Sequence, residues 1–334
     1  MKRREVDLNA AITKSALAVV TILAIAGACL VGPSGLSVTQ SIAGAFSDGP
    51  AGVIIREIRL PRALAAWLAG AALGASGAAM QGLLRNPLAD PGVLGVSATA
   101  ALGAVIAIYF NISAASFAAT PIAAILFAGL ATVALYALGA GRLAPSRLIL
   151  VGVGISSFAG ALIALVMNLA PNPFILSDLV NWLFGAVANR SFEDLALTAP
   201  FIALGFALAL VAAPGLTALS LGEETATTLG VDIARVRALA IAGAALMTGA
   251  SVALAGAIGF VGIVAPHLAR LASAHDPGRA IIPAALIGGA ILSLADLAIR
   301  LLPFDQELKL GVAAALLGAP GFVFIAARTQ RIAQ

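Results

Sequence analysis

Residues 238–269 form one of several long uncharged stretches of the chain, with 32 consecutive positions that lack Asp, Glu, Lys and Arg. A helix that crosses a membrane needs about 20 apolar residues to span about 30 Å of hydrocarbon. Similar apolar stretches recur along the 334 residues, which are 61% hydrophobic and only 10% charged. A soluble fold cannot cover so much apolar surface with polar side chains. The chain is therefore predicted to be an all-α, polytopic membrane protein.

The apolar stretches predict about ten transmembrane helices, because roughly 200 apolar residues divide into spans of about 20. Gly256, Gly259 and Gly262 interrupt the run at residues 238–269 and allow the chain to turn there, so that run is divided into a seventh span and a short eighth. The other spans are expected at residues 15–32, 63–84, 92–110, 114–139, 148–170, 195–213, 280–299 and 308–327. Residues 1–334 are interpreted as one transmembrane domain, with cytoplasmic segments at residues 1–14, 219–237 and 328–334.

The distribution of basic residues predicts the orientation. With both termini in the cytoplasm, thirteen of the 19 Lys and Arg residues lie inside and the other six lie outside, as the positive-inside rule requires. The net charge of +4 then reflects basic inner loops rather than nucleic-acid binding. A cleaved signal peptide is the alternative for the first stretch, but the apolar run continues past Cys29, which favours an uncleaved span.

Three of the outer basic residues, Arg56, Arg59 and Arg62, crowd into the segment before the second span. Two interpretations remain open at this stage. The arginines extend to lipid head groups, or they form an exposed basic patch that docks an acidic partner through bidentate contacts. At the outer end of the span expected at residues 280–299, Asp296 stands four residues before Arg300, which predicts an intrahelical ion pair.

The fifth span carries small or weakly polar residues at every fourth position, and this spacing makes a slanting stripe on one helix. The stripe is Gly152, Ser156, Gly160, Ala164 and Asn168. It predicts either close helix packing or the wall of a pathway. Ionisable groups are almost absent from the spans, which argues against a proton-driven carrier. The chain also lacks a phosphate-binding P-loop, so an ATP-driven machine needs a separate ATPase subunit.

The segment between the sixth and seventh spans predicts a short cytoplasmic helix. Glu223 and Glu224 suit its first turn, and Gly230 is a typical helix stop. A helix of about seven residues is marginal alone, so it needs a partner surface. The alternative is an interfacial helix that lies on the lipid.

Several short motifs occur along the chain. Each is weak evidence for a protein family by itself, but together they are highly specific. They are Ile58-Arg59-Leu60-Pro61-Arg62, Ser76-Gly77-Ala78-Ala79-Met80-Gln81, Asn86-Pro87-Leu88-Ala89-Asp90-Pro91-Gly92, Leu221-Gly222-Glu223-Glu224-Thr225-Ala226, Gly256-Ala257-Ile258-Gly259, Pro266-His267-Leu268-Ala269-Arg270, Leu294-Ala295-Asp296 and Leu317-Gly318-Ala319-Pro320. In this order, over residues 56–325, the chain resembles the FecCD family, the permeases of bacterial ABC importers for ferric siderophores, haem and cobalamin.

The resemblance implies a multi-pass permease of the bacterial inner membrane that pairs with a second copy. It implies two cytoplasmic ATPase subunits, which hold ATP and Mg, and an extracytoplasmic binding protein. The residues expected to couple to the ATPase are Gly222, Glu223, Glu224, Thr225, Ala226, Leu229 and Gly230. Those expected to dock the binding protein are Arg56, Arg59, Arg62 and Arg300. Those expected in the pathway and gate are Asn86, Leu88, Ser146, Ser156, Gly160, Ala164 and Asn168.

The sequence departs from the family pattern at Pro145, where relatives carry a hydroxyl residue, and at Lys309, where proline is common. The function expected is import of an iron chelate, a ferric siderophore or haem, by ATP-driven alternating access. Cobalamin or an oxyanion such as molybdate is the alternative cargo. No catalytic residue, metal site or bound cofactor is expected in this chain.

A distant alternative is an intramembrane serine protease, because Gly74-Ala75-Ser76-Gly77 matches the rhomboid motif and His267 offers a base. We expect His267 instead to be a hydrogen-bonding residue at a helix end, and His275 to lie in a loop. An ion-coupled secondary transporter is the third class.

Overall fold

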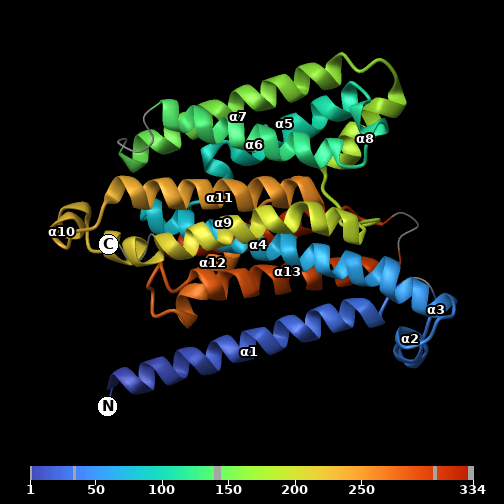
Figure 1. The fold of residues 1–334 in the computed structure, drawn as a ribbon, viewed down its shortest axis with the longest axis horizontal. Helices are drawn as coiled ribbons and strands as arrows, with labels where there is room; N and C mark the ends of the chain where they lie inside the picture. The colour runs from blue at the N-terminus through green and yellow to red at the C-terminus, as the bar shows by residue number, and fades with distance from the viewer. Residues whose placement is uncertain (1, 33–34, 139–143, 304–306, 330–334) are drawn as a thin grey trace.

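The computed structural model describes residues 2–32, 35–138, 144–303 and 307–329, so Met1 and residues 330–334 of the two predicted terminal segments lie outside the described residues. The long helices run roughly along the longest axis of the molecule (Figure 1). They are α1 (Lys2–Leu30), α4 (Leu60–Leu84), α5 (Val96–Tyr109), α6 (Ala119–Ala137), α7 (Pro145–Asn168), α9 (Phe192–Leu219), α11 (Ile233–Ala255), α12 (Val261–Ala272), α13 (Ile281–Leu301) and α14 (Leu310–Thr329).

Shorter elements connect these helices. They are α2 (Val38–Ala45), α3 (Pro50–Val53), the π-helix η1 (Ile54–Arg59), the 3₁₀ helices η2 (Pro91–Leu94) and η3 (Ile112–Ala114), α8 (Pro173–Leu183) and α10 (Glu223–Thr228). In Figure 1, α1 lies along one edge of the molecule and α7 along the opposite edge, while α4, α9 and α11 lie between them. The helix α10 protrudes at one end of the long axis, and α2 and α3 lie at the other end.

The prediction of an all-helical membrane protein is confirmed. Among the described residues, 6 helices are long and apolar enough to cross a membrane: Pro50–Leu84, Ala119–Ala137, Pro145–Asn168, Phe192–Leu219, Ile233–Ala255 and Ile281–Leu301. Four shorter apolar helices, at Ser15–Leu30, Val96–Tyr109, Val261–Ala272 and Leu310–Val323, coincide with the remaining expected spans. The total of ten spans and the cytoplasmic position of both termini stay predictions.

The helix α4 forms the centre of the molecule, and its glycines bring neighbouring backbones into contact. A Cβ atom on Gly77 would lie 1.9 Å from the carbonyl oxygen of Gly262 in the first turn of α12, and one on Gly70 would lie 2.2 Å from that of Gly288 in α13. Lipid offers helices no hydrophobic reason to associate, so close backbone contact through small residues stabilises the bundle. The Gly- and Ala-rich composition thus has a direct packing role.

The helix before α4 is wider than an α-helix because of Pro61. Proline has no N–H, so it cannot donate to the carbonyl of Glu57 one turn earlier, and the ladder shifts to i→i−5 bonds, as from Leu60 N to Ile55 O. The structure therefore makes residues 50–84 one continuous run of helix. The segment that carries Arg56, Arg59 and Arg62 is helical rather than an exposed connection.

Sequence reasoning missed two helices that carry clear start signals. Asn172 precedes Pro173, and its Oδ1 accepts the N–H of Ile175 at 2.9 Å, which caps α8. Ser37 and Gln40 form a capping box at the start of α2. The turn predicted inside the long uncharged run is confirmed, because α11 ends at Ala255 and Gly256 adopts φ +76°.

Candidate functional site

The short helix α10 lies where the sequence predicts a cytoplasmic helix, with Glu223 and Glu224 in its first turn. One carboxylate fixes it to the bundle. Glu223 Oε1 accepts Arg237 Nη2 of α11 at 2.7 Å and lies 3.6 Å from Arg85 Nη2 at the end of α4. The buried side chain of Ala226 seats the inner face of the helix. A helix too short to be stable alone is thus held by one ionic anchor and one buried contact.

The remaining face of α10 points away from the bundle. Glu224, Thr225 and Gly230 are exposed. Leu221 is 64% exposed and Leu229 is 63% exposed, so two large apolar side chains flank the helix without cover. Exposed leucines beside a protruding helix are typical of a surface that binds a partner protein.

The predicted gate residues lie in two segments. Asn86 and Leu88 are in the loop between α4 and η2, and Ser146 is at the start of α7. Asn86 Oδ1 accepts the N–H of Leu88 at 3.0 Å, which closes a turn after α4. Asp90 caps η2 by accepting the N–H of Gly92, and burial raises the pKa of its carboxyl group against the lowering effect of that bond. Ser146 is exposed in the first turn of α7. Contacts join α7 and η2, but their gating role stays a prediction.

The stripe on α7 divides into a packed part and an open part. A Cβ atom on Gly152 would lie 2.0 Å from the carbonyl oxygen of Val93, so this position is a contact with η2. Ser156 is half-buried, whereas Gly160, Ala164 and Asn168 are exposed. Only 11% of the most apolar part of α7 is buried against the rest of the chain. The packing interpretation therefore fits Gly152, and the open positions leave space for a pathway or a second subunit.

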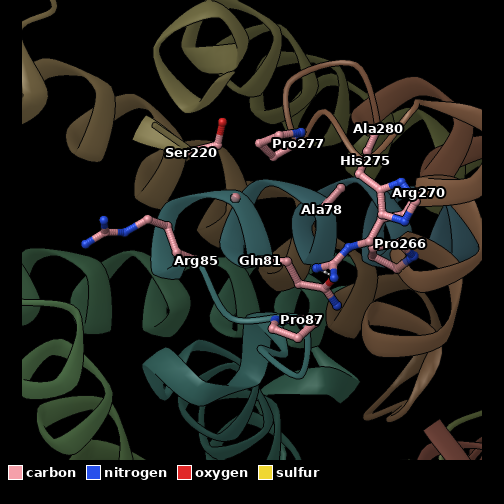
Figure 2. Close-up of a pocket in the computed structure, with 11 residues that line it drawn as sticks. Ala78, Gln81, Arg85, Pro87, Ser220, Pro266, Arg270, His275, Pro277 and Ala280 are labelled. Atoms are coloured by element: carbon pink, nitrogen blue, oxygen red, sulfur yellow. Dashed lines mark hydrogen bonds between the residues drawn. The ribbon is translucent and has the colours of Figure 1, made fainter. Parts of the chain in front are cut away.

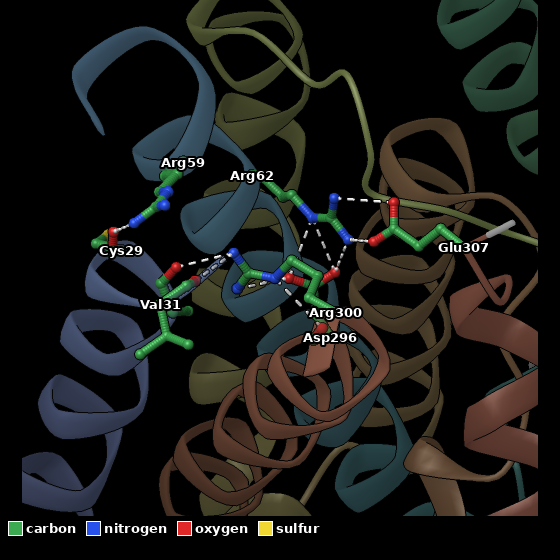
Figure 3. A network of polar contacts seen from close by, with 8 residues as sticks. Cys29, Val31, Arg59, Arg62, Asp296, Arg300 and Glu307 are labelled. Carbon is green, nitrogen blue, oxygen red and sulfur yellow. Dashed lines mark hydrogen bonds and ion pairs between the residues drawn. The ribbon is translucent and has the colours of Figure 1, made fainter. Parts of the chain in front are cut away.

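Figure 3 shows a network of polar contacts made by arginines near the C-terminal end of α1, which lies at the other end of the molecule from α10 in Figure 1. We call Arg59, Arg62, Asp296, Arg300 and Glu307 the arginine network. Arg62 donates to both carboxylate oxygens of Asp296, to Oδ1 at 2.7 Å from Nη2 and to Oδ2 at 3.2 Å from Nε, and also pairs with Glu307. Arg300 lies 3.1 Å from the same Asp296, so the predicted intrahelical pair is confirmed. One buried carboxylate is shared by two guanidinium groups from α4 and α13.

The other contacts of the network lead to α1. Arg59 is 4% exposed, and its Nη1 donates to the carbonyls of Cys29 and Leu30 at 3.1 and 2.9 Å. Arg300 Nη1 donates to the carbonyls of Ala28 and Val31 at 2.9 and 3.2 Å. Cations suit the C-terminal end of a helix, where carbonyls have no helical partner. The network therefore joins α1, α4 and α13.

These contacts bear on the predicted docking residues. Arg59 and Arg300 are buried, and Arg62 is largely covered by carboxylates of its own chain. Arg56 is different, because its side chain is 44% exposed, donates to the carbonyl of Ser47 and pairs with Asp48 near the surface. The interpretation in which these arginines extend to lipid head groups does not describe Arg59 or Arg62. Docking stays a prediction, and Arg56 is the one of the four whose guanidinium is accessible.

Three polar residues lie in the loops around α8 and have different environments. Asn172 and Ser191 are helix caps. Arg190 lines a cavity of about 360 Å³ together with Asp178 and Asn181. Burial lowers the pKa of Arg190, although Asp194 at 3.7 Å acts in the opposite direction. Its Nε atom is buried and has no hydrogen-bond partner among the residues that the structure describes.

The comparisons with known proteins decide the family. The model of the FecCD transport family matches residues 17–328. The chain belongs to the FecCD transport family. The FecCD permease is 42% identical over 283 residues to the vitamin B12 import system permease protein BtuC of Vibrio cholerae, an alignment that covers 83% of each chain. It is 38% identical to the ABC transporter permease protein YvrB of Bacillus subtilis, over 83% of this chain and 80% of that one.

A solved structure supports the same assignment. A metal-chelate type ABC transporter in an inward-facing conformation superposes with a TM-score of 0.84 and 29% identity, over 95% of the FecCD permease and 99% of that chain. The FecCD permease is a multi-pass membrane protein and a transporter component, and ATP hydrolysis takes place in a separate subunit. Its family implies an ATPase, a substrate-binding partner and dimerisation.

The protease alternative is therefore wrong, and the geometry gives a physical reason. Ser76 is fully buried in α4, and its Oγ donates to the carbonyl of Leu73 in its own helix. His267 lies inside α12 rather than at its end, and among the described residues its buried Nδ1 has no hydrogen-bond partner. His275 lies in the loop between α12 and α13, as predicted.

Proposed function

We propose that this chain is the permease subunit of a bacterial inner-membrane importer that moves a metal chelate into the cytoplasm by ATP-driven alternating access. The observation that carries the proposal is the 42% identity with a BtuC protein over 83% of both chains. That relationship favours cobalamin as the cargo. The iron chelate expected from the sequence is the second candidate, and the resemblance to a metal-chelate type transporter supports it.

In this mechanism the exposed face of α10 receives the movement of the ATPase. ATP binding draws two ATPase subunits together, the segment Gly222–Gly230 moves with them, and the pathway changes the side to which it opens. The ionic anchor of Glu223 on Arg237 supports this role, because it joins α10 to a long helix of the bundle. The permease itself does no chemistry and holds no cofactor, since ATP and Mg belong to the ATPase.

The second copy of the permease covers α7. Leu150, Phe158 and Leu165 are exposed on this helix, and a helix so little buried within its chain needs lipid or protein around it. In a homodimer the open positions Gly160, Ala164 and Asn168 then face a central pathway. A wide, uncharged wall suits a bulky chelate.

Two steps test the cargo. The tagged chain is purified in mild detergent, and mass spectrometry identifies the ATPase that accompanies it. Uptake of labelled cyanocobalamin and of a ferric siderophore is then measured in cells that lack their own permeases and express the complete system. Uptake of cyanocobalamin alone supports cobalamin as the cargo, and uptake of the siderophore alone supports an iron chelate instead. Failure of any ATPase to co-purify, where a control importer stays intact, contradicts the importer assembly.

A substitution on α7 tests the pathway. Gly160 and Gly154 both have open space around the position of a Cβ atom, but only Gly160 belongs to the stripe. We expect Gly160→Trp to slow uptake by roughly five- to hundredfold, because overpacking one conformation costs about 1–3 kcal/mol. Gly154→Trp is the matched control and leaves uptake near that of the wild type. Equal effects of the two variants contradict the pathway assignment.

A further inference from the structure

A second cavity lies beside α10, where the ends of α4 and α12 meet the loop before α13. Its volume is about 210 Å³, whereas about 10–15 Å³ on the same scale holds one water molecule. The residues of its wall that carry polar or charged groups are Gln81, Arg85, Ser220, Arg270 and His275. None of the residues that line it is an Asp or a Glu.

Arg270 is the cation at the centre of this wall. Its Nη2 donates to Gln81 Oε1 at 2.7 Å, and Gln81 is itself held by bonds from its Nε2 to the carbonyls of Ala89 and Ile263. Within the part of the chain that the structure describes, no carboxylate forms an ion pair with Arg270. A guanidinium group has five N–H donors, and the chain supplies a neutral oxygen for one of them.

His275 adds a second basic group to the same side of the cavity. Its backbone N–H donates to the carbonyl of Arg270, and its left-handed backbone (φ +64°) turns the chain there. Figure 2 shows the side chains of Gln81, Arg270 and His275 together, whereas Arg85 points away from them. The N-terminal end of α13 follows at Ala280, which also lines the cavity, and the partial positive charge of a helix start adds to the field.

Two carboxylates of neighbouring segments have partners of their own. Asp276 accepts the hydroxyl of Thr217 at 2.6 Å and the N–H of Gly278 at 2.9 Å. Glu223 accepts a hydrogen bond from Arg237 and lies 3.6 Å from Arg85, whose side chain points away from Arg270. The cavity is therefore a hollow with excess positive charge and with polar groups fixed in place.

We propose that this cavity binds a phosphate group, either inorganic phosphate or the phosphodiester of an anionic phospholipid from the cytoplasmic leaflet. The planar fork of an arginine matches two oxygens of a phosphate. Basic hollows between transmembrane helices on the cytoplasmic side are suited to anionic head groups. This inference concerns the chain itself and does not depend on which chelate is transported.

The experiment uses the full-length chain purified in neutral detergent. One arm adds phosphatidylglycerol and counts bound lipid by native mass spectrometry, with phosphatidylcholine as the uncharged comparison. The other arm titrates inorganic phosphate and follows the shift in thermal unfolding. Whichever ligand the wild type binds, we expect Arg270→Gln to weaken its binding by about tenfold or more, since hydrogen bonds between charged groups are the strong ones.

Three variants make the result specific. Arg270→Lys keeps the charge and restores part of the affinity. Arg235→Gln removes an equally basic but exposed side chain at the start of α11 and leaves binding unchanged. His275→Asn removes the ring while keeping a residue type that tolerates the left-handed backbone, and it weakens binding even where Arg270→Gln does not fold.

Each outcome decides the proposal. Binding of phosphatidylglycerol that depends on Arg270 or His275 assigns the site to lipid, and dependence in the phosphate arm alone assigns it to the free anion. Absence of binding in both arms overturns the proposal. Binding that is equal in the wild type and in the folded Arg270 and His275 variants also overturns it, and leaves Arg270 as a residue that only holds Gln81.

Discussion

The two ends of the molecule use charged residues in opposite ways. At the arginine network, Asp296 is 1% exposed and serves two guanidinium groups, while other N–H groups of Arg59 and Arg300 go to backbone carbonyls of α1. At α10, a single carboxylate, Glu223, holds the helix, and Glu224 beside it is exposed. Figure 1 places these regions at opposite ends of the long axis.

This difference separates a structural role from a role in contact with partners. Buried charges that are paired on several sides lock helices in one arrangement, because removing any partner leaves a charge without compensation. A short helix with one anchor and an uncovered face can be moved by a second protein. The following predictions test that contrast, from the largest expected effect to the smallest.

The largest effect is expected from Asp296→Asn. Loss of this carboxylate leaves the guanidinium groups of Arg62 and Arg300 near one another without the charge that they share. Breaking a buried ion pair costs about 3–5 kcal/mol, so the free energy of unfolding falls by about that amount in detergent. Asp48→Asn is the control, because Asp48 is fully exposed beside Arg56, and its unfolding curve matches the wild type. Equal stability of both variants contradicts the locking role.

A smaller, local effect is expected from Glu223→Gln. The neutral side chain no longer compensates Arg237, and leaving a polar group poorly satisfied costs about 1–3 kcal/mol. Hydrogen exchange of residues 222–230 measures this as faster opening of α10, with global stability little changed. Glu224→Gln is the matched control, since Glu224 is exposed. Faster exchange in the control to the same extent argues against the single anchor.

The exposed leucines of α10 are expected to matter only in the complex. Burial of a leucine side chain contributes about 1.5–3 kcal/mol, so Leu229→Ala weakens binding of the co-purified ATPase by roughly tenfold or more. The stability of the isolated permease changes by less than about 0.5 kcal/mol. Leu126→Ala removes a leucine that is equally exposed on α6 and leaves the affinity unchanged. An unaltered affinity in Leu229→Ala removes this residue from the coupling surface.

The smallest effect is expected from Arg56→Glu. An exposed ion pair contributes about 0.2–1 kcal/mol, so docking of the binding protein weakens up to about fivefold. The loss is greatest at low salt, where screening is weakest. Arg235→Glu, at the α10 end, is the control. Arg59→Glu and Arg62→Glu also disturb the network, so only variants with wild-type unfolding report on docking. Unchanged docking of Arg56→Glu at low salt contradicts a role for this arginine.

Local patterns in the sequence were sufficient for much of the fold. Apolar length predicted the membrane helices, and Gly256 predicted the break between α11 and α12. The four-residue spacing of Asp296 and Arg300 predicted their ion pair. The start of α8 was readable from Asn172 and Pro173, although the loop there was not assigned a helix. Such features depend on neighbours within one or two turns, and the sequence shows those neighbours directly.

The sequence by itself thus determined the class of the protein, the position of α10 and the family motifs. Only the tertiary structure decided which arginines are available to a partner. Arg56 and Arg59 are three positions apart and look alike in the sequence, yet one is exposed and the other is 4% exposed against the end of α1. The basic cavity around Arg270 likewise depends on Gln81, which is 189 residues away in the chain. Burial and long-range pairing are set by how helices pack, and no local pattern records that.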